Sequence, residues 1–511
     1  MKRSLLFIFL FAGITLIAQE DVSVKYANTI TAEELKDHLM IFASDEFEGR
    51  ETGMPGQKKA EKYIIDHFKD IGITAHNGKY TQEFQLTVKD PKKVFVSKNA
   101  TTFDFLKDFY YYPGSVDGTN TYDLFFGGFG ISEGDYQEIS EVDVKGKVVL
   151  IFDEEPNNRA GVSRITGTKE QSEWTTKTQK KVDNLTSLGA AGIIYANKEF
   201  NKNVNRIKKF FGNKVMSLDE SADVPSENTT PVFYCSYDMG YELIGDDKKL
   251  KKFKKKAFKK GPITANIGQV ELSFKRNSEK VTSSNVLGYI EGTDKKDELV
   301  VITAHYDHIG VSKDGQINNG ADDDGSGTVT ALEIAQAFAM ARDEGNGPRR
   351  SVLIMAVSGE EKGLLGSKYY TDNPIFPLEN TVVDLNIDMI GRVDEAHADD
   401  SNYIYLIGAD RLSKDLHELS ESTNRKYSQM KLDYTFNDEN DPNKFYYRSD
   451  HYNFAKNGIP VIFYFSGVHE DYHQPGDTPD KIMYDKLANV GKLIFHTAWE
   501  IANREERLKV D

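Results

Sequence analysis

The chain has 511 residues, of which 39% are hydrophobic and 28% charged, a balance typical of a soluble globular protein with room for about three average domains. Its 80 acidic residues outnumber 64 Lys and Arg, and the net charge of -16 argues against general nucleic-acid binding. Cys235 is the single cysteine, which excludes an intramolecular disulfide, a cysteine-ligated zinc site and an iron–sulfur cluster. Any metal must therefore bind to His, Asp and Glu.

The first residues have the pattern of a secretory leader. Lys2 and Arg3 precede an apolar run over residues 5–18, which is too short to span a bilayer comfortably. We therefore expect residues 1–18 to be a signal peptide and the mature chain to be periplasmic or secreted. A short N-terminal membrane anchor is the alternative, and no later stretch is apolar enough to span a membrane.

Apolar spacing divides the remaining sequence into three parts. Residues 19–85 show helical stripes, for example Leu35 and Leu39 one turn apart. Residues 86–275 carry short β-type runs between Gly, Asn and Asp turns, and predict a separate, mostly β module. Over residues 276–511, short apolar strands alternate with amphipathic helices. This alternation predicts an α/β fold, a three-layer sandwich around a mixed, largely parallel sheet.

The β module contains one strongly basic run. Lys248–Lys260 has nine lysines in thirteen residues, with Leu250, Phe253 and Phe258 between them. The run is expected to be a solvated helix face, with a patch for membrane surfaces or polyanions as the alternative.

Strands of the last part are followed by ionisable residues. The expected strands are Leu299–Ala304, Ser351–Val357, Val382–Met389, Tyr403–Ile407 and Ile459–Phe465. The ionisable groups are His305-Tyr306-Asp307-His308, Asp322-Asp323-Asp324 at the start of a helix, Glu360-Glu361, Asp388 and Tyr472-His473. Open α/β sheets gather ligand sites at the carboxyl ends of their strands, so these side chains are expected to lie together.

Such a cluster of carboxylates is costly unless divalent cations compensate its charge. Imidazole and carboxylate ligands without thiolate suit zinc. A bridging carboxylate can hold two ions ~3.5–4 Å apart, as in aminopeptidases and phosphatases.

The ordered motifs AHYDH, GADDDGSG, SGEE, NIDMIGR and DYHQPGDT resemble the co-catalytic di-zinc aminopeptidases, whose wider family includes glutamate carboxypeptidase II and the transferrin receptor. Residues 44–64 resemble the family's N-terminal segment, and residues 285–505 its peptidase core. KGKVVL at 145–150 and LGAAGIIY at 188–195 resemble the protease-associated domain that many relatives carry as an insertion.

The resemblance implies two zinc ions per chain. One ion would bind His305, Asp323 and Asp388, and the other Asp323, Glu361 and His473, with Asp323 bridging the two.

The resemblance also implies roles for three further residues. Glu360 would be the general base that takes a proton from a metal-activated water and delivers it to the leaving amine. Asp307 would fix the orientation of the first imidazole, and Tyr472 would polarise the scissile carbonyl or simply pack beside the loop.

Several motifs allow other interpretations. His469 to His473 spell the His-Glu-x-x-His signature of another zinc peptidase class, but the flanking Gly467 and Pro475 disfavour the continuous helix it needs. The Asp322–Asp324 triplet lacks the spaced ligands of a calcium loop, and Ser358 lacks the glycines of a nucleophile turn. For His451, substrate contact and a structural hydrogen bond stay open.

The sequence thus predicts an exported metallo-aminopeptidase acting on peptides, with no nucleic-acid partner; its oligomeric state stays open. A carboxypeptidase or dipeptidase of the same fold is the alternative, because Arg392 or Arg448 could clamp a terminal carboxylate. A non-catalytic, receptor-like binding protein is a further alternative, disfavoured because every ligand position and the base are of the required type.

Overall fold

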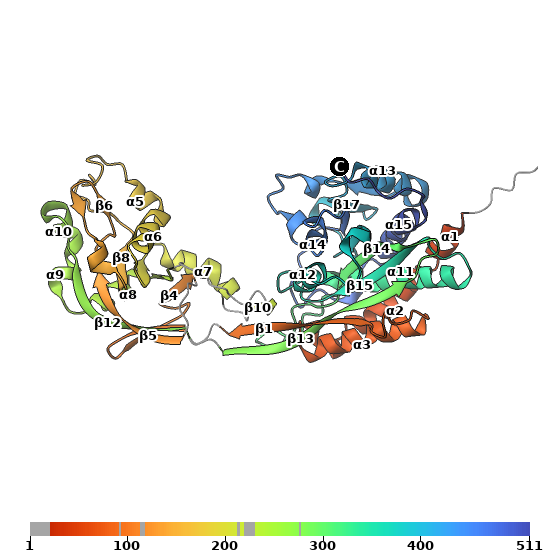
Figure 1. The fold of residues 1–511 in the computed structure, drawn as a ribbon, viewed down its shortest axis with the longest axis horizontal. Helices are drawn as coiled ribbons and strands as arrows, with labels where there is room; N and C mark the ends of the chain where they lie inside the picture. The colour runs from red at the N-terminus through yellow and green to blue at the C-terminus, as the bar shows by residue number, and fades with distance from the viewer. Residues whose placement is uncertain (1–20, 91–93, 113–117, 212–214, 219–229, 275–276) are drawn as a thin grey trace, which may run out of the picture. The chain divides into compact units, whose positions relative to one another are not determined.

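The computed structural model describes residues 21–511 except for 91–93, 113–117, 212–214, 219–229 and 275–276. The expected signal peptide lies outside these described residues. The chain forms two compact units, a first unit of residues 1–84 and 282–511 and a second unit of residues 85–281 (Figure 1). Among the described residues, no helix is long and apolar enough to cross a membrane.

The first unit is built on one mixed sheet, whose strands run in the order β1-β13-β15-β14-β16-β19-β17-β18. The strands are β1 (Thr81–Asp90), β13 (Asn277–Ile290), β14 (Lys295–His305), β15 (Arg350–Val357), β16 (Thr381–Ile387), β17 (Tyr403–Ile407), β18 (Lys431–Asp433) and β19 (Val461–Phe465). The four central strands β15, β14, β16 and β19 are parallel, while β13 and β17 pair antiparallel with their central neighbours. The prediction of a largely parallel sheet is therefore confirmed.

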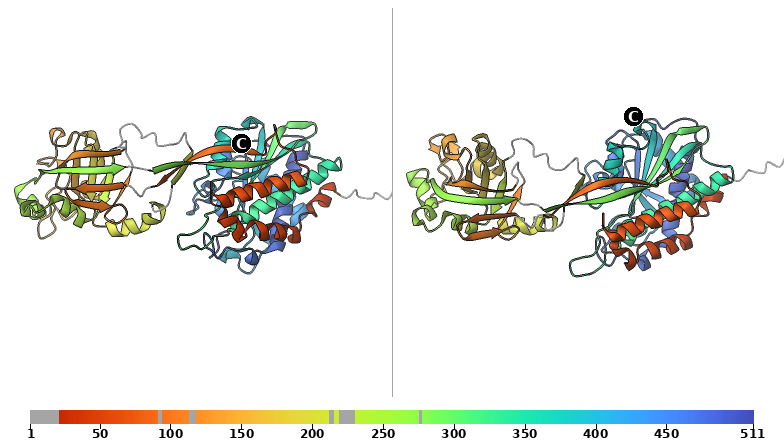
Figure 2. Two further views of the ribbon diagram at one scale, coloured as in Figure 1. Left: turned by 90° about the horizontal axis from the view of Figure 1, so that it is seen from below. Right: turned by 60° about the horizontal axis from the view of Figure 1, so that its bottom comes forward.

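Helices cover both faces of this sheet. One face carries α1 (Val22–Ala27), α2 (Ala32–Phe42), α3 (Pro55–Asp70), α11 (Gly327–Asp343), α13 (Lys414–Thr423) and α15 (Tyr484–Asn503), and the other α12 (Leu365–Asp372) and α14 (His451–Ala455). Figure 2 shows α2, α3 and α11 together across one face. Neighbouring residues of β14 belong to different cores. Val300 and Ile302 share a core with α11 and α15, whereas Val301 shares the other core with α12 and α14. This alternation on a strand buried on both faces produces the predicted three-layer sandwich.

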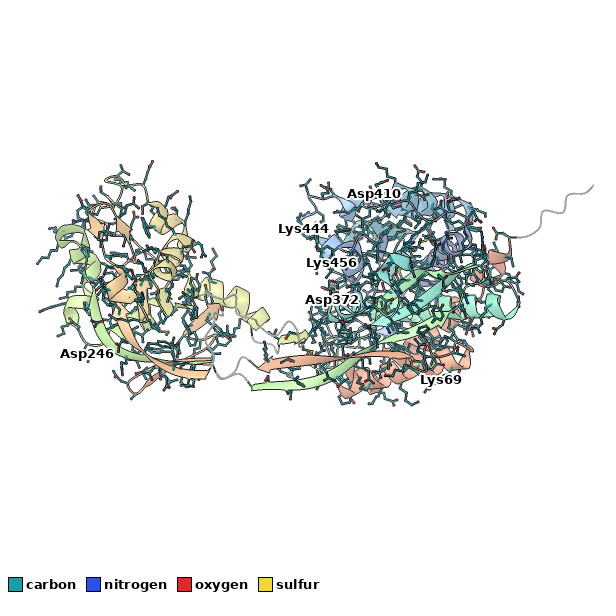
Figure 3. All side chains as sticks on the ribbon, viewed as in Figure 1. Lys69, Asp246, Asp372, Asp410, Lys444 and Lys456 are labelled. Carbon is teal, nitrogen blue, oxygen red and sulfur yellow. The ribbon has the colours of Figure 1, made fainter. Side chains whose placement is uncertain are left out.

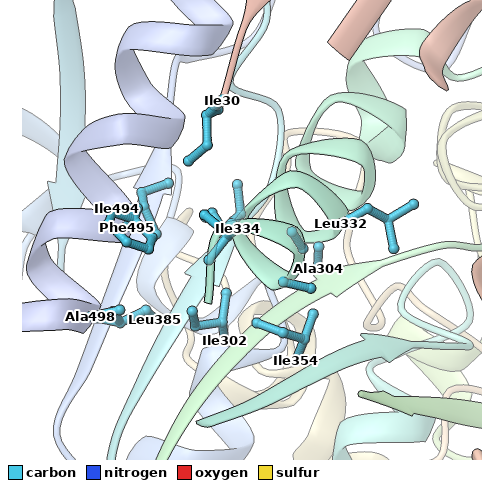
Figure 4. Close-up of a cluster of buried hydrophobic side chains, with 14 of the residues drawn as sticks. Ile30, Ile302, Ala304, Leu332, Ile334, Ile354, Leu385, Ile494, Phe495 and Ala498 are labelled. Carbon is cyan, nitrogen blue, oxygen red and sulfur yellow. The ribbon is translucent and has the colours of Figure 1, made fainter. Parts of the chain in front are cut away.

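Apolar side chains of the sheet and helices meet in the larger core. Figure 4 shows Ile302, Ile354 and Leu385 of the sheet near Ile334 of α11 and Ile494 of α15. The charged side chains that Figure 3 labels, such as Lys69 and Asp372, are instead exposed at the surface.

Local signals set the element boundaries. The Thr31 hydroxyl accepts a hydrogen bond from the Glu34 amide and caps α2, and Pro55 occupies the first turn of α3. Strand β16 ends two residues earlier than predicted because Met389, with φ 55°, turns the chain out of the sheet. Asp388 therefore lies just beyond the strand.

The second unit contains an eight-stranded sheet with helices beside it. Its order is β3 (Thr101–Asp104), β2 (Val94–Lys98), β12 (Ala265–Phe274), β5 (Gly118–Phe126), β8 (Val148–Phe152), β9 (Gly192–Ala196), β11 (Val232–Cys235) and β4 (Phe109–Tyr112). The longer helices are α6 (Thr178–Ser187), α7 (Phe200–Phe211), α8 (Tyr237–Ile244) and α10 (Phe253–Lys260), and β10 (Val215–Leu218) pairs with the end of β1.

The basic run forms α9 (Lys248–Lys251) and α10 in this unit. Its apolar residues Leu250, Phe253 and Ala257 are buried in the core of the unit, while most of its lysines are exposed. This is the arrangement of a solvated helix face.

Candidate metal centre

The sheet brings the five expected ligands to one edge. His305 is the last residue of β14, Asp388 follows β16, and Glu361 lies in the loop after β15. His473 lies in the loop after β19, and Asp323 in the turn that precedes α11. Because β15, β14, β16 and β19 are parallel neighbours, the segments that follow them converge.

The first group of possible ligands surrounds the His305 imidazole. Its Nε2 atom lies 3.3 Å from Asp323 Oδ1 and 3.6 Å from Asp388 Oδ1. These three side chains are close enough together to hold one cation.

A second group shares Asp323 with the first. Nε2 of His473 lies 3.1 Å from Asp323 Oδ2 and 3.1 Å from Glu361 Oε2. His308, for which the sequence analysis assigned no role, adds a third imidazole, and its Nδ1 atom lies 2.8 Å from Glu361 Oε1. Asp323, Glu361 and His308 are also close enough together to hold a cation.

The polar atoms of these groups fit a bound cation. His305 Nε2, Asp323 Oδ2 and Glu361 Oε1 are buried and have no hydrogen-bond partner among the described residues. Buried polar atoms without partners are costly, and cations bound at the two groups would satisfy all three. Imidazole and carboxylate are the donors that zinc takes in proteins.

The charges of the centre support the same conclusion. Burial alone would raise the pKa of Asp323, yet the facing histidines hold it well below its ordinary value. Although burial opposes protonation, the surrounding carboxylates raise the pKa of His473 to about 10 and that of His305 well above its usual range. When no cation is bound, protons on the histidines offset the charge of the carboxylates. A metal must displace these protons in order to bind, so the affinity of the centre for metal must rise with pH.

The outer aspartates of the triplet bind backbone amides instead of facing the centre. Asp324 accepts hydrogen bonds from the amides of His305 (3.1 Å), Gly327 (2.9 Å) and Met389 (3.1 Å), and so joins β14, α11 and the end of β16. Asp322 accepts from the Gly391 amide at 2.6 Å. Only the middle residue of the triplet is thus left to face both groups.

Arg50 supports the Asp322–Asp324 triplet through backbone carbonyls, a role that no sequence motif indicated. Its guanidinium is fully buried and donates to the carbonyl oxygens of Phe42 (3.1 Å), Tyr306 (3.1 Å), Asn319 (2.7 Å) and Gly320 (2.8 Å). These bonds connect α2 and the end of β14 with the segment that leads into Asp323. Arg50 lies within residues 44–64, which resemble the family's N-terminal segment, but no local pattern indicates that its partners are distant carbonyls.

Asp307 has partners other than the expected ones. The Nδ1 atom of His305 is 3.0 Å from the backbone oxygen of Asp307, while the Asp307 carboxylate lies 3.9 Å from it. The carboxylate accepts instead from the Thr52 hydroxyl (2.6 Å) and the Glu360 amide (3.3 Å). The ring is therefore oriented by a carbonyl, because those two donors draw the carboxylate away.

Glu360 belongs to neither group of ligands. Its Oε2 atom lies 4.0 Å from His305 Nε2, and its side chain is 12% exposed. It lines a pocket together with Asp323, Asp388, Met389, Phe445, Arg448, Phe463, Phe465, Val468, Tyr472 and His473. The Tyr472 ring stacks on His473 with centroids 3.9 Å apart. Apolar and aromatic walls thus adjoin the carboxylates.

The alternative motifs have other surroundings. His469 and His473 do not lie on a helix, and His469 Nε2 faces Asp322 Oδ2 at 3.3 Å, so the geometry contradicts the His-Glu-x-x-His interpretation. Ser358 is buried against Ser283, their hydroxyls 2.6 Å apart, and the buried His451 ring stacks on a phenylalanine.

Two curated proteins are similar to this chain over less than half of its length. Aminopeptidase YwaD of Bacillus subtilis is 28% identical over 45% of this chain and 47% of its own length. A probable zinc metalloprotease of Pyrenophora teres f. teres is 28% identical over 43% of this chain and 52% of its own length. This chain spans about half the length of these curated relatives.

A solved structure shares the fold over nearly the whole chain. The aminopeptidase from Aneurinibacillus sp. strain AM-1 superposes with a TM-score of 0.53 and 19% identity, covering 96% of this chain and 98% of its own. The model of Peptidase family M28 matches residues 285–498, which contain all five expected ligands. The resemblance to the co-catalytic zinc aminopeptidases is confirmed over residues 285–498, which are similar to Peptidase family M28.

Proposed function

We propose that this chain is a zinc-dependent aminopeptidase that removes N-terminal residues from peptides and uses two zinc ions. Support comes from two groups of ligands that share Asp323 beside a partly apolar pocket, and from the names of the relatives. One ion would be held by His305, Asp323 and Asp388, and the other by Asp323, Glu361 and His473.

Bound zinc supplies Lewis acidity, which withdraws electron density from a carbonyl and makes water more acidic. Glu360 carries the proton transfers. As water forms its C–O bond to the carbonyl carbon, the carboxylate takes the proton, and it then gives this proton to the nitrogen as the C–N bond breaks. The observation that carries this role is that Glu360 lies 4.0 Å from His305, lines the pocket together with Asp323 and His473, and belongs to neither group of ligands.

The pocket favours a substrate with a free amine. A cationic α-amine would be attracted to the carboxylates of Glu360 and Asp388, while the neighbouring aromatic and aliphatic walls would contact the side chain of the substrate. Tyr472 would contact the scissile carbonyl from the same wall.

A carboxypeptidase is the second candidate, because Arg448 lines the same pocket. Its guanidinium lies 4.9 Å from the centre of the Phe445 ring and forms no ion pair within the described part of the chain. Arg392, the other possible clamp, pairs with Asp471 at 3.1 Å. A terminal carboxylate would therefore have to bind at Arg448.

Two variants test the assignment of base and ligand. Glu360→Gln keeps the shape of the side chain but cannot take the proton, so turnover of a free-amine peptide should fall by about 10²–10⁴-fold while zinc content is unchanged. Asp323→Ala should lower zinc content as well as turnover. Full activity in Glu360→Gln would refute the proposed role of this residue.

Two further expectations remain proposals. The pattern of residues 1–18 supports export, which N-terminal sequencing of the mature protein would test. Residues 86–275 would be a protease-associated domain inserted into the peptidase fold. The parallel strands β8 and β9, which contain the two motifs' apolar runs, support this proposal.

A further inference from the structure

We propose that His308 is a direct ligand of the cation at Asp323, Glu361 and His473, so that this position has four protein ligands instead of three. The inference rests on the proposed function only in requiring that zinc binds at this centre. It concerns a residue for which the motif resemblance implied no role.

The His308 ring is fixed beside the second group. It lies three residues after the end of β14, it is fully buried, and its amide donates to the Arg50 carbonyl at 3.2 Å. One edge of the ring packs against Gly320, where a Cβ atom would lie 2.5 Å from His308 Cδ2. A glycine at this position, with φ 57°, lets the ring approach the centre closely.

The His308 ring approaches Glu361 closely. His308 Nδ1 and Glu361 Oε1 are 2.8 Å apart, yet neither atom has a hydrogen-bond partner among the described residues. A second carboxylate oxygen, Asp323 Oδ2, lies 3.8 Å from the same nitrogen. Three buried ligand atoms therefore converge at this position.

These separations match ligands of a common ion. Zinc binds nitrogen and oxygen ligands at ~2.0–2.2 Å, so two ligands of one ion lie roughly 2.8–4 Å apart. Both distances from His308 Nδ1 are in this range, as are the 3.1 Å distances from His473 Nε2 to Asp323 and Glu361. The rings of His308 and His473 are inclined by 70° with centroids 5.7 Å apart, so both can approach the two carboxylates without colliding.

The experiment measures zinc binding of the full chain. Wild-type protein, His308→Ala and His308→Gln are titrated with zinc in competition with a chromophoric chelator, and circular dichroism checks that each is folded. His496→Ala is the matched control, because His496 is also buried but bonds to Ser23 away from the centre. We expect both His308 variants to keep one tight site and to lose at least about 10-fold in affinity at the other, while the control keeps both.

The glutamine variant separates a ligand from a merely structural neighbour. A glutamine amide can still pair with Glu361, so a structural role would be rescued, whereas zinc affinity would not. X-ray absorption of the zinc-loaded protein should also show fewer imidazoles per zinc in His308→Ala than in the wild type.

Unchanged affinity and imidazole number in His308→Ala, or rescue by glutamine, would overturn the inference. Absence of zinc binding in the wild type would overturn it together with the proposed function. If the wild type binds two ions in the expected way but cleaves no peptide, the aminopeptidase assignment fails while His308 stands as a ligand.

Discussion

Replacement of Arg50 by methionine should destabilise the first unit and weaken its metal centre. The buried guanidinium donates four hydrogen bonds to carbonyl oxygens. Bonds to a charged group are worth about 1.5–3 kcal/mol each, so the gross loss is roughly 6–12 kcal/mol. Removing the buried charge also removes its desolvation penalty of several kcal/mol, but it leaves the carbonyl oxygens without their partner. A net loss of about 3–5 kcal/mol in unfolding free energy is therefore expected.

Thermal unfolding and zinc titration measure the two effects separately. A loss of this size should lower the unfolding temperature by roughly 6 °C or more. Arg350→Met is the matched control, because Arg350 is also buried and its guanidinium donates to the carbonyls of Ile501, Arg504 and Glu505. Arg350 is the first residue of β15 and therefore lies at the end of that strand remote from the centre. Both variants should be less stable, and only Arg50→Met should lose zinc affinity. Unchanged stability in Arg50→Met, or equal loss of zinc affinity in both, would refute this account.

Three further outcomes are expected. Burial raises the pKa of Glu138 in the second unit to about 7, so the stability of this unit should fall as pH rises from about 4.5 to 7. Hydrogen exchange of residues 148–152 should show this dependence of stability on pH, and Glu138→Gln should abolish it. Zinc at 100 times its Kd should raise the unfolding free energy by about 2.7 kcal/mol, and a chelator should reverse the shift in a thermal scan; no shift would argue against binding to the folded chain. Ser449→Ala removes the hydroxyl that donates to Asp388 at 2.7 Å, and should weaken one zinc site about 10-fold while leaving the other unchanged in the chelator titration.

The sequence was sufficient to predict the layered fold and which side chains gather at one edge. Parallel strands carry their following loops to the same edge, so His305 and Asp388 could be placed near each other from strand patterns alone. The exact end of β16 could not be predicted, because it depends on the left-handed backbone conformation of Met389. No sequence pattern indicates that conformation.

The supports of the centre were beyond prediction from local patterns. Arg50 binds carbonyls as far as 270 residues away, and any residue type supplies such carbonyls. The Asp477 carboxylate accepts hydrogen bonds from the backbone amides of Asp322 and Asp323. These contacts could not be predicted either, because backbone amides are not specific to a residue type. His308 was visible beside His305 in the motif, but its approach to Glu361 depends on how the two loops pack.

Zinc analysis of the purified chain, combined with hydrolysis of one peptide in free, N-acetylated and C-amidated forms, tests the proposed function most directly. We expect about two zinc ions per chain, with cleavage abolished by acetylation and retained after amidation. Cleavage abolished by amidation alone would instead support binding of a terminal carboxylate at Arg448. A chain that binds no zinc and cleaves none of the three peptides would contradict the account.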